Sequence, residues 1–408
     1  MGNTKKIILE VLPASHGDCI LISVPDNNRF RRILIDGGIS DTYHSFLKAR
    51  LIELSLNQEV IDLCVVTHID RDHIEGIIEL LFDNGVELSK TISIKEVWHN
   101  SFKHLQFEKV KSSDASEIAI LKGIIAGAKY QNQLIDPNNQ NQEISAKQGS
   151  TLAALLHTGA YEWNKSFNGN AVNYDYKSEH KYDAYTIHLL SPNTKKLQRL
   201  SKLWKKELDK KKYGFKISDD LLFDDAFEFS LMSGVDPSYI SPDTPISKGA
   251  FNYEDMLEDV EFDTSDTNGS SIAFILEHAS RKLLFLGDSH PDIIADSLEK
   301  LKIEQGYELI FDAVKVSHHG SQRNISKRIL QLIDSPKYII STNGTKHGHP
   351  DISTLVKIIC KESMFHKELL FNYRTQSAEF ILKTNLLEWH NCSFVFPGNE
   401  LEGLYIEI

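Results

Sequence analysis

Cysteine is scarce in this sequence: the chain of 408 residues holds four, and no two of them are separated by two residues. A small scaffold held by disulfides and a C-x-x-C zinc or redox motif are therefore excluded. Cys19 and Cys64 lie within apolar runs, so we expect buried, reduced thiols there. A chain of this length buries roughly three quarters of its unfolded surface, and its core needs no covalent support.

Long apolar runs are also missing, because no stretch of about 18 apolar residues occurs. We therefore expect no membrane span and no membrane partner. The N-terminal segment turns polar too early for a secretory signal peptide. A cytoplasmic protein is the resulting expectation, and nothing in the sequence indicates an oligomeric state.

Positive charge is in the minority, with 45 Lys and Arg against 57 Asp and Glu and a formal net charge of −12. This balance argues against a protein that coats duplex DNA through a broad basic face. An active site that acts on nucleic acid is compatible with it, because metal ions can supply positive charge locally. The acidic total fits a small or single-stranded substrate better than a long duplex.

The first hundred residues carry apolar, β-branched runs that alternate with polar turns. This pattern predicts an antiparallel start to a sheet. The run at 61–67 is almost continuously apolar, as expected for a strand buried on both faces. The predicted strands are 6–12, 19–24, 32–35, 61–67 and 92–98, and the predicted helices are 42–56 and 74–82.

The middle of the chain differs, because helical and polar segments replace the strands. Helices are predicted at 113–133, 152–157 and 194–212, with one strand at 185–190. The helix at 194–212 is amphipathic and ends in a basic run, KKELDKKK, which is typical of a solvated helix face. Residues 217–266 are strongly acidic and contain few apolar runs, so we expect a long loop or a partly ordered insertion.

Regular alternation of strands and helices resumes at 271. Two rounds of alternation with an insertion between them favour a sandwich of two mixed sheets with helices on the outside, an α/β fold. The predicted strands are 271–277, 282–286, 313–317, 338–341, 378–383 and 386–390, and the predicted helices are 291–301, 324–333 and 352–360.

The segment Thr67-His68-Ile69-Asp70-Arg71-Asp72-His73 places four metal-ligand side chains within six residues, where a buried strand ends and a helix begins. Asp72 as a helix cap is the alternative interpretation. Two His and two Asp packed this closely argue against it, since desolvating paired carboxylates is costly without cations. Alternate residues of an extended segment point the same way, so His68, Asp70 and Asp72 can converge, with His73 turned toward a neighbouring point. That geometry suits two metal ions.

With this segment the sequence resembles the metallo-β-lactamase superfamily, whose motif at this loop is H-x-H-x-D-H. Here Asp70 stands in place of the second His, a variant similar to the hydrolase domain of ComEC-type DNA-uptake proteins and their free-standing relatives. Six further segments are similar to family motifs and occur in the same order: HGDC (16–19), LIDGG (34–38), NGSS (268–271), LGD (286–288), VSHHGS (316–321) and GHP (348–350).

The resemblance implies an αββα sandwich and covers about 1–100 and 265–360. We therefore expect a catalytic domain formed by 1–100 and 265–408. Residues 101–264 would be an insertion, partly helical and with the acidic loop 217–266.

The resemblance also implies metal ligands. His68 and Asp70 would bind the first metal, Asp72 and His73 the second, and Asp288 both. His349 would complete the second site, and His318 would be a ligand or a donor to a substrate phosphate.

Further site residues are expected around these ligands. Asp36 and Asp18 would contact metal ligands and fix their orientation without binding the metal themselves. Asp72, His318 and His319 would serve catalysis, while Asn268, Ser321 and His347 would contact the substrate. Asn268 takes the place where many relatives have a third His, and Ser321 has the alternative of capping the next helix.

Two divalent ions, Zn²⁺ or Mn²⁺, are the expected cofactors. A carboxylate in place of an imidazole shifts the preference toward Mn²⁺ or Mg²⁺. Two such cations activate a bridging water or hydroxide and stabilise an in-line displacement. The sequence therefore favours a phosphodiesterase or nuclease acting on single-stranded nucleic acid or a cyclic nucleotide.

Two alternatives stay open. One is a hydrolase of lactones or thioesters, because the fold supports that chemistry as well. The other is a metal-stabilised subunit of a multi-protein bacterial defence system, with 101–264 as its protein-binding surface.

Overall fold

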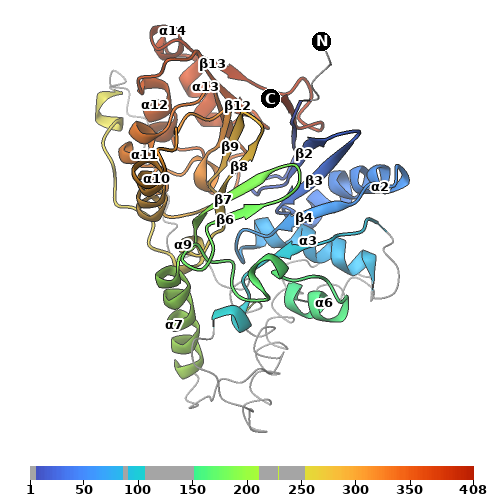
Figure 1. Ribbon diagram of the computed structural model, residues 1–408. Helices are drawn as coiled ribbons and strands as arrows, with labels where there is room; N and C mark the ends of the chain where they lie inside the picture. The colour runs from blue at the N-terminus through green and yellow to red at the C-terminus, as the bar shows by residue number, and fades with distance from the viewer. Residues whose placement is uncertain (1–5, 86–90, 106–150, 211–227, 229–252) are drawn as a thin grey trace.

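The computed structural model describes residues 6–85, 91–105, 151–210, 228 and 253–408. Two mixed β-sheets pack face to face in it, and helices cover the outer face of each sheet (Figure 1). The architecture is the two-sheet α/β sandwich that the alternation of strands and helices predicts. No helix within the described ranges is long and apolar enough to cross a membrane.

The six-stranded sheet has the order β14-β1-β2-β3-β4-β5. Antiparallel pairing joins β14, β1, β2 and β3, whereas β4 and β5 run parallel to β3. The strand that precedes the four-ligand segment, β4, is buried on both faces apart from its second residue, as its apolar run predicts. The bounds are β1 Ile8–Val11, β2 Ile20–Asp26, β3 Arg29–Ile35, β4 Ile61–Val65, β5 Val97–Trp98 and β14 Leu404–Glu407.

The eight-stranded sheet has the order β13-β12-β11-β10-β9-β8-β7-β6, with parallel pairing from β9 to β13 and antiparallel pairing from β6 to β9. Its inner face shares one apolar core with the six-stranded sheet. The bounds are β6 Glu179–Lys181, β7 Thr186–Ser191, β8 Ala273–His278, β9 Arg281–Phe285, β10 Ala313–Lys315, β11 Lys337–Ile340, β12 Lys367–Phe371 and β13 Cys392–Val395.

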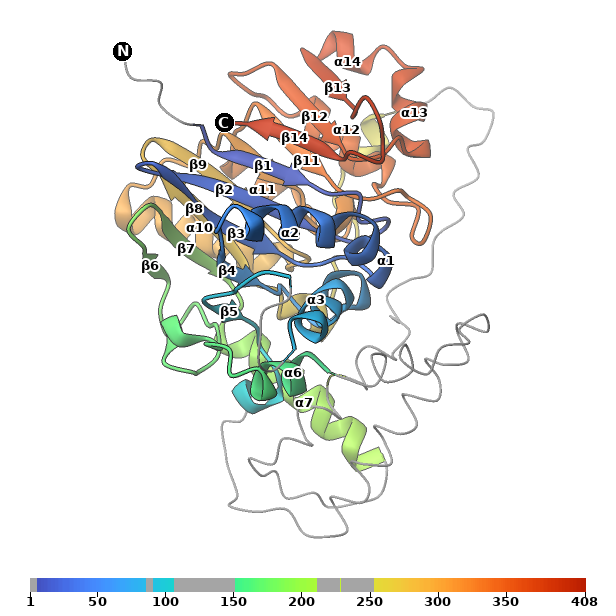
Figure 2. The same ribbon diagram turned by 90° about the vertical axis from the view of Figure 1, so that its right-hand side faces the viewer.

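Helices on the six-stranded side include α2 and α3 (Figure 2), and they enclose a second apolar core. The first helical stretch is continuous from α1 through the π-helix η1 to α2, as predicted for 42–56. Buried Cys19 and Cys64 belong to this core. The bounds on this side are α1 Ser40–Thr42, η1 Tyr43–Leu47, α2 Lys48–Leu56, α3 Arg71–Asn84, η2 Phe102–Leu105, α6 Leu152–Thr158, η3 Lys165–Phe167 and α7 Thr194–Lys210.

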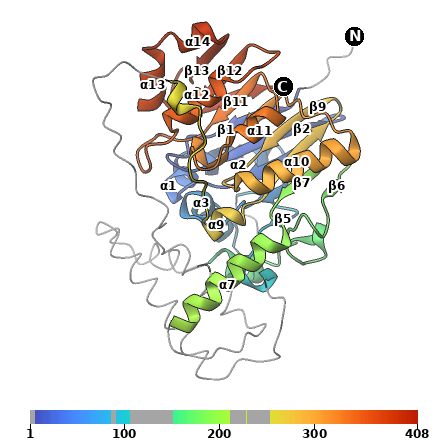
Figure 3. The ribbon, with the colours of Figure 1, turned by 90° about the vertical axis from the view of Figure 1, so that its left-hand side faces the viewer.

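A third apolar core lies under the helices of the eight-stranded side, among them α10 and α11 (Figure 3). The predicted helix at 352–360 has the bounds expected from the sequence. The bounds on this side are η4 Glu254–Met256, α9 Asp266–Gly269, α10 Pro291–Gln305, η5 Ser317–Gly320, α11 Lys327–Leu332, α12 Ile352–Cys360, α13 Gln376–Leu382 and α14 Leu386–Trp389.

The prediction of two closing strands at 378–383 and 386–390 is wrong, because both segments are helical, as α13 and α14. Ala378 and Ile381 are the buried residues of α13, a spacing of three that suits a helix. The Thr375 side chain caps this helix by accepting from the Ala378 amide. The strands of this region are instead β12, β13 and β14.

The range 101–264, assigned to an insertion, contributes to the sandwich where the structure describes it. Its strands β6 and β7 extend the eight-stranded sheet, with β7 paired to β8. The predicted helix at 113–133 lies outside the described residues, as does most of the acidic stretch. From 253 onward that stretch forms η4 and α9 and leads into β8.

Candidate metal centre

Asp288 lies among four imidazoles where β4, β9 and β10 end. Its Oδ2 atom is 3.6 Å from Nε2 of His68, 3.5 Å from Nε2 of His73, 3.7 Å from Nε2 of His318 and 3.9 Å from Nε2 of His319. Ligand atoms that surround one cation tetrahedrally at about 2.1 Å lie roughly 3.4 Å apart. The spacing around Asp288 is therefore close to that of ligands that share a cation.

Hydrogen bonds at Nδ1 orient His68 and His73. The Thr67 hydroxyl donates to Asp36 Oδ2 at 2.7 Å, so its oxygen can accept from Nδ1 of His68 at 3.0 Å. Nδ1 of His73 donates to the same Asp36 oxygen at 2.8 Å. With Nδ1 protonated, each neutral ring presents its Nε2 lone pair to Asp288, which is how histidine ligands are prepared for a metal.

His318 and His319 are held in the same way from the opposite side. Nδ1 of His319 lies 2.8 Å from the Ser341 carbonyl oxygen, and Nδ1 of His318 lies 2.9 Å from Oδ1 of Asn324. The Asn324 amide group donates to Asp263 Oδ2 at 3.1 Å, which leaves its Oδ1 as the acceptor. All four rings therefore have an oxygen partner at Nδ1 and direct Nε2 to the centre.

The carboxylates of Asp70 and Asp72 face these imidazoles. Asp70 is the N-cap residue of α3, yet its side chain makes no capping hydrogen bond. Its Oδ2 atom lies 3.3 Å from Nε2 of His68. Asp72 follows in the first turn, with Oδ2 3.6 Å from Nε2 of His319. Asp72 is thus not the cap of this helix, and both carboxylates are placed as ligands would be.

The charges in this cluster depend on one another. Burial opposes the charged form of Asp288, but the imidazoles, His318 first among them, hold its pKa well below the usual value. Burial likewise opposes a charged His319, while Asp18 and Asp288 raise its pKa to about 9. The pKa of His73 is raised well above its usual value because Asp288 outweighs burial. Protons and divalent cations therefore compete for the same nitrogen atoms.

Left-handed backbone conformations occur at Asp36, His318 and His319, with φ of 55°, 45° and 54°. Each costs a non-glycine residue about 1–2 kcal/mol. The amide of His318 donates to the Gly287 carbonyl at 2.9 Å, which holds the strained turn against the residue that precedes Asp288. Strain of this kind persists where the surroundings fix it, and the hydrogen bonds around Asp36, His318 and His319 do so here.

Close backbone contacts place α3 against the loop that carries Asp36. A Cβ atom on Gly76 would lie 1.9 Å from the Gly37 carbonyl oxygen, and one on Gly17 would lie 1.9 Å from the Asp72 carbonyl oxygen. The Gly37 amide also donates to the His73 carbonyl at 2.8 Å. Glycine at these positions therefore sets the distance between Asp36 and His73.

Asp18 stands behind His319 and is paired with a buried lysine. Nζ of Lys315 donates to Asp18 Oδ2 at 2.6 Å, and Nδ1 of His319 lies 3.5 Å from Oδ1 of the same carboxylate. Lys315 and Asp18 are both almost fully buried. The pair links the 16–19 turn to β10 and places a negative charge next to the ring that faces Asp72.

Asn268 and Ser321, expected as substrate contacts, have partners within the protein. The Asn268 amide group donates to Asp263 Oδ2 at 2.7 Å, so it belongs to the network behind His318. Ser321 Oγ accepts from the Arg323 amide at 3.3 Å. The cap of α11 is Ser326, which sets aside the alternative of Ser321 as that cap.

His349 and His347 lie beside the cluster, on the loop after β11. The ring of His349 is 5.4 Å from the ring of His318, and its Nδ1 atom is 3.6 Å from Asp351 Oδ2. The structure therefore brings His319, and not His349, next to Asp72. Burial lowers the pKa of His349, and it lowers the pKa of His347 to about 3.

Two residues near Asp72 were not singled out as site residues from the sequence. Nζ of Lys346 lies 3.9 Å from Asp72 Oδ1, and 43% of its side chain is exposed. Burial lowers the pKa of His16 to about 4, although Asp72 opposes this shift. His16 belongs to the HGDC segment, the one signal that could have found it, whereas nothing local marks Lys346, Asp263 or Asn324.

The residues present fit divalent cations. Several of their buried polar atoms, among them Nε2 of His68, His73 and His319 and Oδ1 of Asp288, have no hydrogen-bond partner among the described residues. Nitrogen and carboxylate oxygen donors together suit zinc, manganese or iron. The donor atoms lie within 4.8 Å of one another in three groups: His68, His73 and Asp288; Asp72, His73 and His319; and Asp18, Asp36 and His73.

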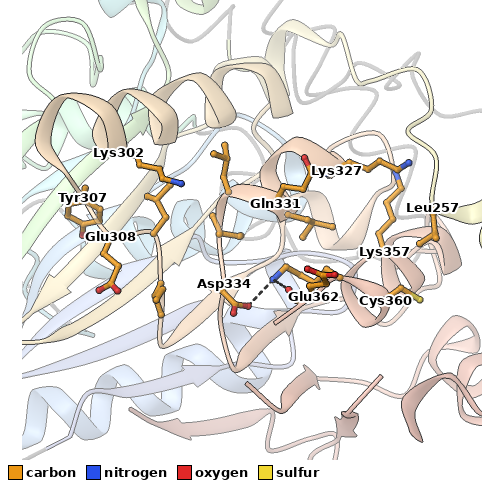
Figure 4. Close-up of a pocket in the computed structure, with 16 residues that line it drawn as sticks. Leu257, Lys302, Tyr307, Glu308, Lys327, Gln331, Asp334, Lys357, Cys360 and Glu362 are labelled. Atoms are coloured by element: carbon orange, nitrogen blue, oxygen red, sulfur yellow. Dashed lines mark hydrogen bonds and ion pairs between the residues drawn. The ribbon is translucent and has the colours of Figure 1, made fainter. Parts of the chain in front are cut away.

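A separate groove of about 720 Å³ lies by α11 and α12, and the residues that line it do not include the cluster (Figure 4). Its lysines are largely paired. Lys361 contacts Asp334 at 2.8 Å, and Lys357 contacts Asp259 at 2.8 Å. Among the described residues, none of the groups of side chains that could share a cation lies in this groove, so the metal centre stays the candidate functional site.

No family model and no curated protein matches the chain. Among solved structures, the chain is similar to the metallo-β-lactamase fold protein YhfI from Bacillus subtilis, with 10% identity, a TM-score of 0.38, and coverage of 99% of this chain and 100% of that one. The chain is also similar to the diiron β-hydroxylase CmlA from Streptomyces venezuelae, with 10% identity, a TM-score of 0.37, and coverage of 100% of this chain and 54% of that one. A third similar structure is Zn²⁺-bound PqqB from Methylobacterium extorquens, with 9% identity, a TM-score of 0.36, and coverage of 98% of this chain and 100% of that one.

Similarities this distant carry no information on activity. The fold is evident from the topology itself, because two mixed sheets pack between outer helices. The ligand-type side chains gather at the carboxyl ends of β4, β9 and β10. This α/β sandwich is consistent with the metallo-β-lactamase fold.

Proposed function

We propose that this protein is a metal-dependent hydrolase that cleaves phosphodiesters. One observation carries the proposal: four imidazole Nε2 atoms lie within 3.5–3.9 Å of Asp288 Oδ2, and each ring has an oxygen partner at Nδ1. Two divalent cations held by this cluster would supply a water nucleophile at neutral pH and stabilise the charge of a displacement. His68, Asp70, Asp72, His73, Asp288 and His319 would hold them.

The surroundings of Asp72 support an anionic substrate. Lys346 places a partly exposed ammonium group 3.9 Å from the Asp72 carboxylate. His16, whose pKa is lowered to about 4, is neutral at pH 7 and can donate or accept a hydrogen bond. A phosphodiester carries one negative charge, so Lys346 would attract it and hold it beside the metal ligands.

His318 is the imidazole of the cluster that substrate can reach. Its side chain is 13% exposed, whereas those of His68, His73 and His319 are at most 1% exposed. Its Nδ1 contact with Asn324 fixes the ring, so Nε2 stays directed toward the reaction centre. We therefore assign to His318 the contact with a phosphate oxygen or the leaving group.

Single-stranded nucleic acid and cyclic nucleotides are the substrate classes that this proposal includes. Carboxylate-rich ligation favours Mn²⁺, and Zn²⁺ is the second candidate. The first test is metal analysis of the purified protein, together with hydrolysis of bis(p-nitrophenyl) phosphate in Mn²⁺ and in Zn²⁺. A His68→Ala/Asp72→Asn variant should lose both bound metal and hydrolysis.

A matched control changes the same residue types away from the site. Asp41 and His44 are exposed on the first helical stretch, so Asp41→Asn/His44→Ala should keep metal and activity. Absence of bound metal under every condition would overturn the ligand assignment. Two bound metals with turnover of a lactone or a thioester, and none of the phosphodiester, would overturn the substrate assignment alone.

A further inference from the structure

A row of cations follows one face of α7. Lys195, Arg199, Lys202 and Lys206 are all exposed, and they are spaced four, three and four residues apart. This spacing places them on one side of a helix. At 1.5 Å per residue the row extends over roughly 16 Å. We call these four residues the α7 basic face.

The α7 basic face stands out in a chain with a net charge of −12. A solvated helix face commonly alternates charges, but from Lys195 to Lys206 the exposed positions that the structure describes are these four cations and Gln198. In the sequence, Glu207 and Asp209 come only after this row. Arg199 pairs with Asp266 at 2.9 Å. For the three lysines, no described carboxylate lies within the 4.0 Å of an ion pair.

The start of α7 is attached to the loop that carries Asp288. Nζ of the buried Lys196 lies 2.9 Å from Nδ1 of His290 and 2.9 Å from Asp292. His290 follows Asp288 by two residues. Arg199 holds α9 through Asp266, so the basic face begins beside the segments that build the centre (Figure 3).

A groove of about 200 Å³ lies at this end of the helix, between α7 and α10. Lys195, Arg199, Lys300 and Tyr174 line it. Two carboxylates also line it, Asp292 and Asp296, and each of them is paired with a cation, Lys196 and Arg328 respectively. Nζ of Lys300 lies 5.3 Å from the centre of the Tyr174 ring. Cations that line a groove are one means by which proteins hold the backbone of single-stranded nucleic acid.

We propose that the α7 basic face binds the sugar–phosphate backbone of single-stranded nucleic acid and guides it to the metal centre. This inference rests on the proposed phosphodiesterase function and selects a polymer over a free cyclic nucleotide. A single row of side chains fits one strand, and the acidic remainder of the chain disfavours a duplex.

The test is fluorescence anisotropy with the full chain and a labelled phosphorothioate oligodeoxythymidine of about 20 nucleotides, titrated at several salt concentrations. Lys202→Glu/Lys206→Glu should weaken binding about tenfold or more at low salt. The slope of log K against log salt is negative, and each contact with a single strand contributes roughly 0.7 to its magnitude. Loss of two contacts should therefore reduce that magnitude by about 1.4.

The matched control is Lys302→Glu/Lys383→Glu, which reverses two exposed lysines, one on α10 and one at the C-cap of α13. It should bind like the wild type, and both variants should hydrolyse bis(p-nitrophenyl) phosphate at the wild-type rate. Equal loss of binding in the two variants, or tighter binding of a duplex, would overturn the inference.

Failure of the inference and failure of the proposed function give different results. Hydrolysis of the small diester without oligonucleotide binding would overturn the α7 assignment and leave the phosphodiesterase proposal intact. Salt-dependent oligonucleotide binding through Lys202 and Lys206 without hydrolysis of any diester would overturn the proposed function. The assignment of the α7 basic face as a binding surface would then stay intact.

Discussion

The carboxylate of Asp36 joins two strand ends to one imidazole: Oδ2 of Asp36 lies 2.8 Å from Nδ1 of His73, and the Thr67 hydroxyl donates to the same oxygen at 2.7 Å. Asp36 follows β3, Thr67 follows β4, and His73 belongs to α3. The carboxylate therefore fixes both the tautomer of His73 and the position of its ring.

Replacement of Asp36 by Asn should lower metal affinity. An amide nitrogen in place of Oδ2 cannot accept from Nδ1 of His73, so that ring would lose its orientation. Loss of a partner behind a metal ligand typically reduces affinity 10–100-fold. Chelator competition measures the change, and Asp41→Asn, on an exposed position, is the control. Equal affinities of the two variants would show that Asp36 does not orient His73.

The second prediction concerns which imidazole is next to Asp72. Nε2 of His319 lies 3.6 Å from Asp72 Oδ2, whereas the ring of His349 packs near His318. We expect His319→Ala to lower the number of bound metals from two to one, and His349→Ala to retain both. Elemental analysis of the two purified variants gives the answer. The reverse result would return His349 to the ligand role that the family resemblance implies.

Local sequence signals select four ligand-type residues, at 68, 70, 72 and 73, which the structure places around one centre. The apolar strand β4 ends at Val65, shortly before His68, and the four ligand-type residues that follow lie within six positions, so their proximity needs no tertiary information. The alternation of strands and helices similarly predicts the sandwich. The helices α13 and α14 were predicted as strands because short apolar runs fit both periods.

The remaining residues of the site depend on contacts between distant parts of the chain. Asp18 and Lys315 are 297 positions apart, and Asn324 meets Asp263 across 61 positions. No local pattern marks such a pair, and Asp263 lies in an acidic stretch that resembles a loop. His319 takes the place beside Asp72 through the left-handed turn at 318–319, which residue types alone do not reveal.

The third prediction is that the stability of the metal-free protein depends on pH. Asp18 and Asp288 outweigh burial and raise the pKa of His319 to about 9, above its usual value of 6.5. The folded state then binds more protons than the unfolded state between these values. Stability should therefore be full below about pH 6.5 and decrease as the pH rises through 9, by an amount of the order of 3 kcal/mol.

Urea unfolding of chelator-treated protein at pH 6, 7.5 and 9 tests this dependence. His319→Ala should make the decrease smaller, because one titrating group is removed while His73, whose pKa is also raised, still titrates. Added Mn²⁺ or Zn²⁺ should stabilise the protein more at pH 9 than at pH 6, because metal displaces protons. A stability that rises between pH 6 and 9 in the metal-free wild type would contradict the charge coupling.

The fourth prediction tests how α3 is placed. Alanine in a helix interior normally stabilises by about 1 kcal/mol relative to glycine. At position 76 a Cβ atom would lie 1.9 Å from the Gly37 carbonyl oxygen, so Gly76→Ala must displace α3 or the loop that carries Asp36. We expect a loss of about 3 kcal/mol or more in the free energy of unfolding, the opposite sign to the helix propensity.

The same displacement should weaken metal binding, because it changes the distance between Asp36 and His73. Gly398→Ala is the control, since a Cβ atom there meets no atom within 4 Å, and it should leave stability within about 0.5 kcal/mol of the wild type. Urea unfolding and metal titration of both variants separate packing from ligation. A stabilised Gly76→Ala protein with two bound metals would show that the contact between Gly37 and Gly76 does not position the centre.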